Sequence, residues 1–149
     1  MNPDKTKSAN KRKALKILLV AVIILTALIL LRSCGAADGA DSLEGRQAFL
    51  RKLGWEIDPA SEDQRTVQLP QALEGMLLKY NELQLSQGYD LQSYAGKTVM
   101  RYVYEIVNYP EATEKVLATL LVHRGKVIGG DITDTAPGGK VCGFKGPQG

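Results

Sequence analysis

Histidine and cysteine are scarce in this chain of 149 residues, which contains one histidine and two cysteines. Cys34 and Cys142 are too few for a small domain held together by disulfides, so we expect packing to stabilise the core. Neither cysteine lies at a zinc-finger spacing from His123, and no calcium-loop pattern of alternating carboxylates occurs. The sequence therefore predicts no metal site.

The glycine and serine motifs of common enzymes are missing as well. No Gly-x-Ser-x-Gly elbow accompanies His123, and no glycine-rich phosphate-binding pattern is present. We therefore expect no catalytic residues and no cofactor, and a domain that is not an enzyme. The alternative is a small hydrolase, which requires two carboxylates such as Asp90 and Asp131 to converge in one cleft.

Excess positive charge is absent from most of the chain, although the formal net charge is +3. Residues 1–37 contain seven Lys and Arg against one acidic residue, a net charge of +6, whereas residues 38–149 contain twelve Lys and Arg against fifteen Asp and Glu, a net charge of −3. A nucleic-acid-binding domain needs a basic footprint on its folded part. We therefore expect no nucleic-acid partner and attribute the basic end to a membrane.

The basic end leads into one long apolar run, ALKILLVAVIILTALILL, over residues 14–31. A helix of these 18 residues is about 27 Å long, close to the roughly 30 Å hydrocarbon core of a bilayer. Lys16 and Arg32 extend its reach by snorkelling to the two interfaces. The basic flank places the N-terminus in the cytoplasm. We therefore predict a transmembrane signal anchor over residues 14–32, which binds the lipid bilayer.

Two other interpretations of this segment remain open. It is similar to a cleavable signal peptide, because small residues follow it and offer a processing site. It is also similar to a lipoprotein signal, because Leu31-Arg32-Ser33-Cys34 ends in a cysteine as a lipobox does. A lipobox has a small uncharged residue where this chain has Arg32, so lipidation at Cys34 is the less favoured prediction.

Composition divides the chain into four parts. We expect a basic cytoplasmic tail at residues 1–13, the anchor at residues 14–32, a flexible linker rich in Gly and Ala at residues 33–40, and an extracytoplasmic domain at residues 41–149.

The first half of the domain predicts a helix, two short strands separated by a polar loop, and a longer helix, at residues 41–53, 55–58, 66–69 and 71–87. Asp41 is the expected N-cap of the first helix, since Glu44 completes a capping box, and Gly54 ends the helix. Pro59 is expected to stop the first strand. Leucines and other apolar residues recur at helical spacing in the second helix, which Gly88 ends.

The second half of the domain is rich in strands, predicted at residues 99–108, 116–123, 126–133 and 140–144. Side chains alternate along the first of these, so Met100, Tyr102 and Tyr104 share one face. Arg124-Gly125 is a two-residue turn that joins the next two strands as an antiparallel hairpin. The order of elements predicts an α+β fold in which two helices pack on one face of an antiparallel sheet.

A set of short motifs occurs in a fixed order through the domain: Gly54-Trp55-Glu56-Ile57-Asp58-Pro59, Leu69-Pro70, Tyr80-Asn81-Glu82-Leu83-Gln84, Gln87-Gly88-Tyr89-Asp90-Leu91, Tyr94-Ala95-Gly96-Lys97, Asn108-Tyr109-Pro110 and Gly129-Gly130-Asp131. Together they resemble the bacterial domain-of-unknown-function family 4830, over residues 45–144. The family has no established activity. The resemblance therefore implies only an architecture, one hydrophobic segment followed by such a domain, and a location at the cell membrane, chiefly of Gram-positive bacteria.

The candidate interaction surface combines three loop tyrosines with an unusual pair of strand glycines and the acidic residues beside them: Tyr89, Asp90, Tyr94, Tyr109, Gly129, Gly130 and Asp131. Glycines inside a strand mark a place where another backbone or ligand comes close, or where a helix packs tightly. We expect a membrane-tethered interaction domain that binds an unknown envelope protein or ligand. The alternatives are the carboxylate hydrolase and a binding module of lipoprotein type.

Overall fold

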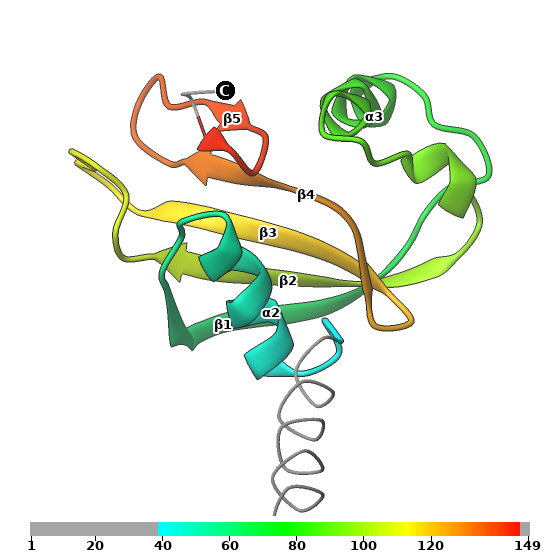
Figure 1. Ribbon diagram of the computed structural model, residues 1–149. Coiled ribbons are helices and arrows are strands. Elements are labelled where there is room, and N and C mark those ends of the chain that lie inside the picture. Colours follow the sequence, from blue (N-terminus) through cyan, green and yellow to red (C-terminus); the bar gives the residue numbers. More distant parts are fainter. Residues whose placement is uncertain (1–38, 147–149) are drawn as a thin grey trace, which may run out of the picture. The chain divides into compact units, whose positions relative to one another are not determined.

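The computed structural model describes residues 39–146 (Figure 1). The elements follow in the order α2 (Leu43–Lys52), β1 (Ile57–Gln68), α3 (Met76–Ser86), the 3₁₀ helix η1 (Leu91–Tyr94), β2 (Thr98–Ile106), β3 (Val116–His123), β4 (Lys126–Asp134) and β5 (Val141–Cys142). The five strands of the described region belong to one antiparallel sheet in the order β1-β2-β3-β4-β5, so each strand lies beside its neighbour in sequence. The predicted α+β class, with two helices on an antiparallel sheet, is confirmed.

Helix α2 begins one residue later than its capping-box pattern predicts. Ser42 is the N-cap, and its Oγ accepts a hydrogen bond from the backbone N–H of Gly45 at 3.0 Å. Serine and aspartate are similarly good N-caps, because the side-chain oxygen of either accepts a hydrogen bond from a free N–H of the first turn. The pattern therefore identified the start of the helix to within one residue. Gly54 follows the helix with φ of 90°, as expected for a residue that ends a helix.

Strand β1 corrects the prediction of two short strands separated by a loop. It runs from Ile57 through Pro59 to Gln68, and its pairing with β2 shifts register between Asp58 and Asp63. β1 is an edge strand, where a proline disrupts the sheet least. At the irregularity the Ser61 hydroxyl accepts a hydrogen bond from the Glu105 backbone N–H at 2.8 Å, so a side chain takes the place of the missing ladder partner.

Helix α3 is shorter than predicted, because it begins at Met76 rather than near residue 71. Its N-cap, Gly75, has φ of 55° and makes no side-chain capping bond, so the chain turns sharply there. Leu73 is buried all the same and packs from the preceding loop. The two buried side chains of the helix itself are polar, Asn81 and Gln84.

The β3–β4 hairpin forms as predicted, and β3 has the expected bounds. Arg124 and Gly125 have φ of 50° and 76°. Positive φ at both central residues is the geometry of a type I′ turn, whose twist matches that of the two strands. The pairing of β3 with β4 shifts register between Leu121 and Val122, just before the turn.

Both faces of the sheet are covered, which corrects the prediction that both helices pack on one face. On the first face, α2 packs against alternate residues of β2, β3 and β4; the buried members of this cluster are Ala40, Leu50, Tyr102, Tyr104, Ile106, Val116, Ala118, Leu120, Val122, Val127, Ile132 and Phe144. On the second face, α3 and the loops around it cover a smaller cluster: Leu69, Leu73, Leu91, Val99, Leu121 and Ile128. Figure 1 shows the two helices well apart, with η1 beside α3. The apolar residues on both sides of β3 explain why each face needs a cover.

The predicted tail at residues 1–13, the anchor at residues 14–32, most of the linker and Cys34 lie outside the described residues. Between residues 39 and 146, no helix is long and apolar enough to cross a membrane.

Candidate functional site

A hollow of about 370 Å³ lies on the second face of the sheet, beside α3. We call it the α3 groove. Its apolar lining residues are Val67, Leu69, Leu77, Leu91, Leu121 and Val141. Its polar lining residues are Tyr80, Arg101, Thr119, Asp131 and Thr133. The groove therefore combines apolar walls with a small number of polar groups, which is the usual composition of a binding site.

Strand register explains how the polar groups come together. Thr119 of β3 is the direct partner of Asp131 on β4, so their side chains share a face. Arg101 of β2 is the partner of Leu121, the next residue of β3 on that face. The walls on the other side come from α3, which contributes Leu77 and Tyr80.

Asp131 is buried in this lining, with a relative exposure of 5%. Its Oδ2 accepts a hydrogen bond from the Tyr80 hydroxyl at 2.6 Å, and its Oδ1 accepts one from the Thr133 hydroxyl at 2.7 Å. Among residues 39–146, the ion pairs join Arg46 to Glu62, Arg65 and Arg101 to Asp63, and Lys115 to Glu105. Within that part of the chain, Asp131 has neutral partners only.

Burial raises the pKa of Tyr80 far above its ordinary value, and the charge and the hydrogen bond of Asp131 raise it further. The nearby Arg101 acts in the opposite direction but does not outweigh them. Tyr80 consequently keeps its proton throughout the physiological pH range and serves as a permanent donor to the carboxylate. It is no candidate for a general base.

The two strand glycines allow close packing on both faces of β4. A Cβ at Gly129 would lie 2.9 Å from Oε1 of Gln84 on α3, and a Cβ at Gly130 would lie 2.5 Å from the Phe144 ring on the opposite face. Oε1 of Gln84 accepts a hydrogen bond from the Gly130 N–H at 2.8 Å, and Nε2 of Gln87 donates to the Gly130 carbonyl at 3.1 Å. The helix is thus held to β4 through glutamine side chains, and protein atoms fill the space over both glycines.

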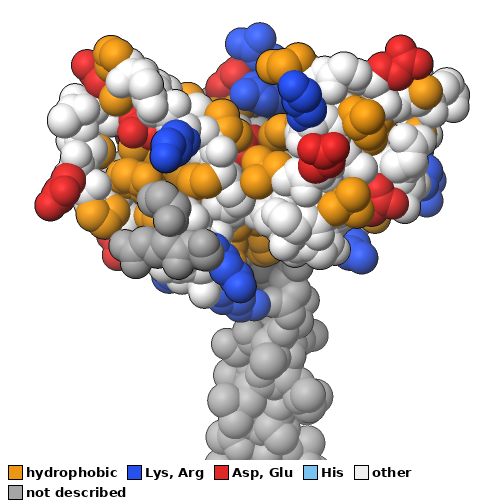
Figure 2. Space-filling view, turned by 90° about the horizontal axis from the view of Figure 1, so that it is seen from above, with side chains coloured by type: hydrophobic (Ala, Val, Ile, Leu, Met, Phe, Trp, Pro, Cys, Tyr) orange, Lys and Arg blue, Asp and Glu red, His pale blue; other side chains and the backbone are white. Residues whose placement is uncertain are grey.

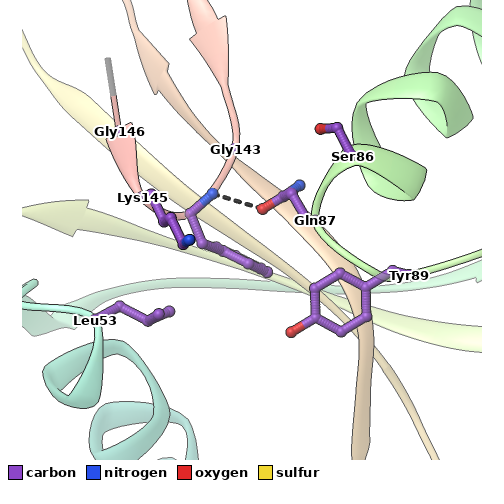
Figure 3. Close-up of a pocket in the computed structure, with 8 residues that line it drawn as sticks. Leu53, Ser86, Gln87, Tyr89, Gly143, Lys145 and Gly146 are labelled. Carbon is purple, nitrogen blue, oxygen red and sulfur yellow. Dashed lines mark hydrogen bonds between the residues drawn. The ribbon is translucent and has the colours of Figure 1, made fainter. Parts of the chain in front are cut away.

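A second hollow, of about 490 Å³, lies beside the C-terminal segment (Figure 3). Figure 3 shows Tyr89 pointing from the segment after α3 toward the C-terminal segment, with Leu53 at the end of α2 on the other side. The Tyr89 ring meets the Phe144 ring edge to face at 5.9 Å, and Oε1 of Gln87 accepts a hydrogen bond from the Phe144 N–H at 2.6 Å. Burial raises the pKa of Tyr89. Of the described residues that line this hollow, one is charged, Lys145, which is exposed.

Tyr109 lies at a third place. Its ring stacks on Trp55 with centroids 5.6 Å apart, and both line a hollow of about 400 Å³ with Asn108 and Pro110. The Trp55 Nε1 donates a hydrogen bond to the Phe144 carbonyl at 2.6 Å. The stack therefore joins the loop after β2 to the segment between α2 and β1, and the Trp55 hydrogen bond joins that segment to the C-terminal segment.

Asp90 and Tyr94 lie around η1. Asp90 accepts hydrogen bonds from the Ser93 hydroxyl at 2.7 Å and from the Asn81 side-chain amide at 3.2 Å, and these bonds lower its pKa. Tyr94 meets the ring of His123 at 5.5 Å. Asp90 thus caps a short helix, and Tyr94 and His123 pack against each other at one end of the sheet.

The structure separates the seven predicted surface residues. Asp131 lines the α3 groove, and Tyr109 lines the hollow beside Trp55. Tyr89 lines the C-terminal hollow, where Gly130 lies beneath Phe144. Tyr94 and Asp90 lie at η1. Gly129 is covered by α3 and η1.

Tyr80 and Arg101, which complete the polar part of the groove, were not predicted. The alternation in β2 that places Arg101 beside Val99 and Val103 was a usable signal for the second of them.

A buried cation on the first face was also not predicted. Arg46 of α2 is 3% exposed and donates hydrogen bonds to the Tyr104 hydroxyl at 2.5 Å, to Glu62 at 2.9 Å and to the Ala40 carbonyl at 2.9 Å. Its guanidinium also lies 3.7 Å from the centre of the Tyr102 ring. Burial alone would lower the pKa of Arg46, but its hydrogen bonds to Tyr104 and Glu62 outweigh burial and raise it. We call these residues the Arg46 network.

Cys142, whose Sγ is 3.4 Å from the Ile132 carbonyl, is a half-buried free thiol, and burial raises its pKa. It therefore has little thiolate at neutral pH and is a poor nucleophile. In the part of the chain that the structure describes, no group of three or more His, Cys, Asp or Glu side chains is placed to hold a metal ion.

Exposed hydrophobic side chains lie on α3 and β5. Met76 is 83% exposed, Leu78 49%, Leu85 55% and Val141 55%. Figure 2 looks down on the side that carries α3 and β5, and shows hydrophobic side chains interspersed with acidic and basic ones. Scattered exposure of this kind is ordinary on a surface, but Val141 stands out because it also lines the α3 groove.

Comparison with known families agrees with the motif resemblance. The chain belongs to the family described as domain of unknown function (DUF4830), whose model matches residues 49–132. The matched residues run from α2 to β4 and include most of the α3 groove. No curated protein and no solved structure matches the chain.

Proposed function

We propose that this chain is a membrane-tethered binding domain of the bacterial envelope, without enzymatic activity, and that the α3 groove receives its partner. The observation that carries the proposal is the groove itself. It is apolar along Val67, Leu77 and Leu121, it holds polar groups at defined places, and it has a volume of about 370 Å³. These properties are those of a site that recognises a ligand group by shape and by a few hydrogen bonds.

The placement of the carboxylates supports a binding role over hydrolysis. Paired-carboxylate hydrolysis requires two acidic groups that face one cleft. Asp131 lines the α3 groove and bonds to Tyr80 and Thr133, whereas Asp90 caps η1 and bonds to Asn81 and Ser93. The groove is lined by Asp131 and not by Asp90.

The sequence of the N-terminal region supports the tether. Residues 14–32 are apolar apart from Lys16 and Arg32 and are of spanning length, and residues 1–13, which contain five Lys and Arg, precede them. The domain would then lie outside the cytoplasm, with its partner an envelope protein. A lipoprotein-type module acylated at Cys34 is the alternative, and it leaves the domain on the same side of the membrane.

Site-specific photo-crosslinking of the full chain in its own cells tests the groove as a binding surface. A photoreactive amino acid at Val141 is expected to give a discrete adduct, because Val141 is both exposed and part of the groove. The matched control is Gln64, an exposed position of β1 whose strand partner, Tyr102, belongs to the first face. Equal adducts at both positions, or none at either, would contradict the proposal.

Proximity labelling tests the location of the same chain. A labelling enzyme fused after residue 149 is expected to mark envelope proteins and not cytoplasmic ones. Predominantly cytoplasmic labelling would exclude an extracytoplasmic domain. Release of the chain from membranes by a high-salt wash would exclude both the anchor and the acylated form.

A further inference from the structure

The α3 groove contains a buried carboxylate, that of Asp131, which forms no ion pair among residues 39–146. Asp131 is 5% exposed, and its hydrogen-bond donors are the hydroxyls of Tyr80 and Thr133. Neutral donors stabilise a carboxylate less than a cation does, and a buried charge without a counter-charge is costly. A group that brings positive charge to Asp131 would remove that cost.

Arg101, a cation that also lines the groove, pairs with Asp63 and not with Asp131. Its Nη1 lies 3.9 Å from Oδ2 of Asp63, and its side chain is 37% exposed. Asp63 in turn accepts a hydrogen bond from Arg65 at 3.1 Å. Asp63 thus has two cations, Arg65 and Arg101, beside it on β1 and β2, and among residues 39–146 Arg101 forms no ion pair with Asp131.

Asp131 also has capacity for a further donor. Each of its two oxygens accepts one hydrogen bond from the protein, at 2.6 Å for Tyr80 and 2.7 Å for Thr133. An ionised carboxylate offers about four acceptor positions, so about two remain. The ion pair that Asp131 lacks and the acceptor positions that it retains both point to a cationic donor.

The walls restrict which cation fits. Leu77 of α3 and Leu121 of β3 line the same hollow as Asp131, and Val67 and Val141 are also part of it. A small hydrated ion would leave these apolar surfaces in water. A lysine side chain covers them with its aliphatic stem and carries a compact ammonium at the end.

We propose that the α3 groove binds a lysine side chain of the partner protein, with the stem against Leu77 and Leu121 and the ammonium donating to Asp131. This assignment rests on the proposed role of the groove as a binding surface. It names the ligand group that the surface recognises. An anionic ligand is disfavoured because it would be brought against the Asp131 carboxylate.

The test uses the full chain, reconstituted in lipid nanodiscs, and two fluorescent pentapeptides. One carries a central lysine between glycine and serine residues, and the other carries norleucine, which has an aliphatic chain but no ammonium. Dissociation constants are measured by fluorescence anisotropy. The lysine peptide is expected to bind about tenfold more tightly than the norleucine peptide, the effect of one charge-assisted hydrogen bond.

Three variants locate the effect. Asp131→Asn is expected to abolish the preference for lysine, while Glu82→Gln, which removes an exposed carboxylate of α3, is expected to leave it unchanged. Leu77→Gln keeps Asp131 but makes one wall polar, and is expected to weaken both peptides. Because the comparison of the two peptides on the unaltered chain requires no substitution, the test stands even where a variant fails to fold.

Equal affinity for the two peptides, or binding of neither, overturns the lysine assignment. The same holds if Asp131→Asn folds and retains the preference. These outcomes are distinct from failure of the proposed function, which is measured by crosslinking at Val141 in cells. A groove that crosslinks in cells but shows no lysine preference remains a binding surface for a different group.

Discussion

Among residues 39–146, each face of the sheet buries one charged side chain, and the two are bonded in opposite ways. On the first face Arg46 is held by Glu62, by the Tyr104 hydroxyl and by backbone carbonyls, so its charge and its donors are satisfied. On the second face Asp131 has two neutral donors and lines an open groove. The first arrangement closes the core of the domain, whereas the second leaves a polar group that a partner can complete.

Removal of the Arg46 guanidinium is expected to have the largest effect on stability. Arg46→Ala removes the cation that donates to Glu62, to the Tyr104 hydroxyl and to the Ala40 carbonyl, and leaves Glu62 with the Tyr104 hydroxyl as its donor. The free energy of unfolding should fall by about 4 kcal/mol. Urea denaturation measures the change. Arg65→Ala, which breaks an exposed ion pair with Asp63, is the matched control and should cost under about 1 kcal/mol. Similar losses of unfolding free energy for both variants would show that the buried Arg46 network stabilises the domain no more than an exposed ion pair does.

A methyl group at Gly130 is expected to disturb the packing of Phe144 on β4, on the first face of the sheet. In Gly130→Ala the new Cβ would lie 2.5 Å from the Phe144 ring and close to the Thr119 carbonyl, so the unfolding free energy should fall by about 3 kcal/mol. Gly138→Ala is the control, because nothing lies within 4 Å of its Cβ and only its positive φ of 81° is unfavourable. That conformational cost is about 1 kcal/mol. Equal melting temperatures of the two variants would contradict the close approach.

Acid is expected to weaken the first face through Glu62. Burial acts to raise the pKa of Glu62, but hydrogen bonds from Tyr104 and Arg46 outweigh it, so the pKa lies below its ordinary value of 4.5. A depressed pKa in the folded state contributes stability that is present above the unfolded pKa and is lost as the pH falls through the folded pKa. The stability of the unaltered chain should therefore decline below pH 4.5 more steeply than that of Glu62→Gln. Parallel curves of unfolding free energy against pH would exclude this contribution.

Neutralisation of Asp131 is expected to have the smallest effect on stability. Asp131→Asn retains an oxygen to accept from Tyr80 and an amide to donate to the Thr133 hydroxyl, while it removes a buried charge that has no ion pair. Its unfolding free energy should stay within about 1 kcal/mol of the unaltered chain. A loss as large as that of Arg46→Ala would mean that Asp131 belongs to the structural framework, and would remove the contrast between the two faces.

Local patterns predicted the elements whose signals lie within a few residues. Strand β3 and the Arg124-Gly125 turn have the expected places, because an apolar run and a turn that requires positive φ are local properties. The prediction failed at β1, where Pro59 was expected to end the strand. Proline disrupts a central strand but is tolerated at a sheet edge, and the position of β1 at the edge is not visible from its own residues.

The candidate site was predictable only in part for the same reason. Asp131 was selected from the Gly129-Gly130-Asp131 motif, but its partner Tyr80 is 51 residues away in sequence. Arg46 was invisible as a buried group, because a charged residue on a helix is normally expected at the surface. Its burial depends on Glu62 and Tyr104, which reach it from two different strands.

By itself the sequence determined the α+β class, the central hairpin, the concentration of positive charge in residues 1–37 and membership of a family over residues 49–132. These follow from composition, short-range periodicity and ordered motifs. The tertiary structure alone decided that the helices cover opposite faces, that Arg46 is fully partnered and that Asp131 is not. Those properties depend on which distant residues meet, because the energy of a buried charge is set by its neighbours in space and not by its neighbours in the chain.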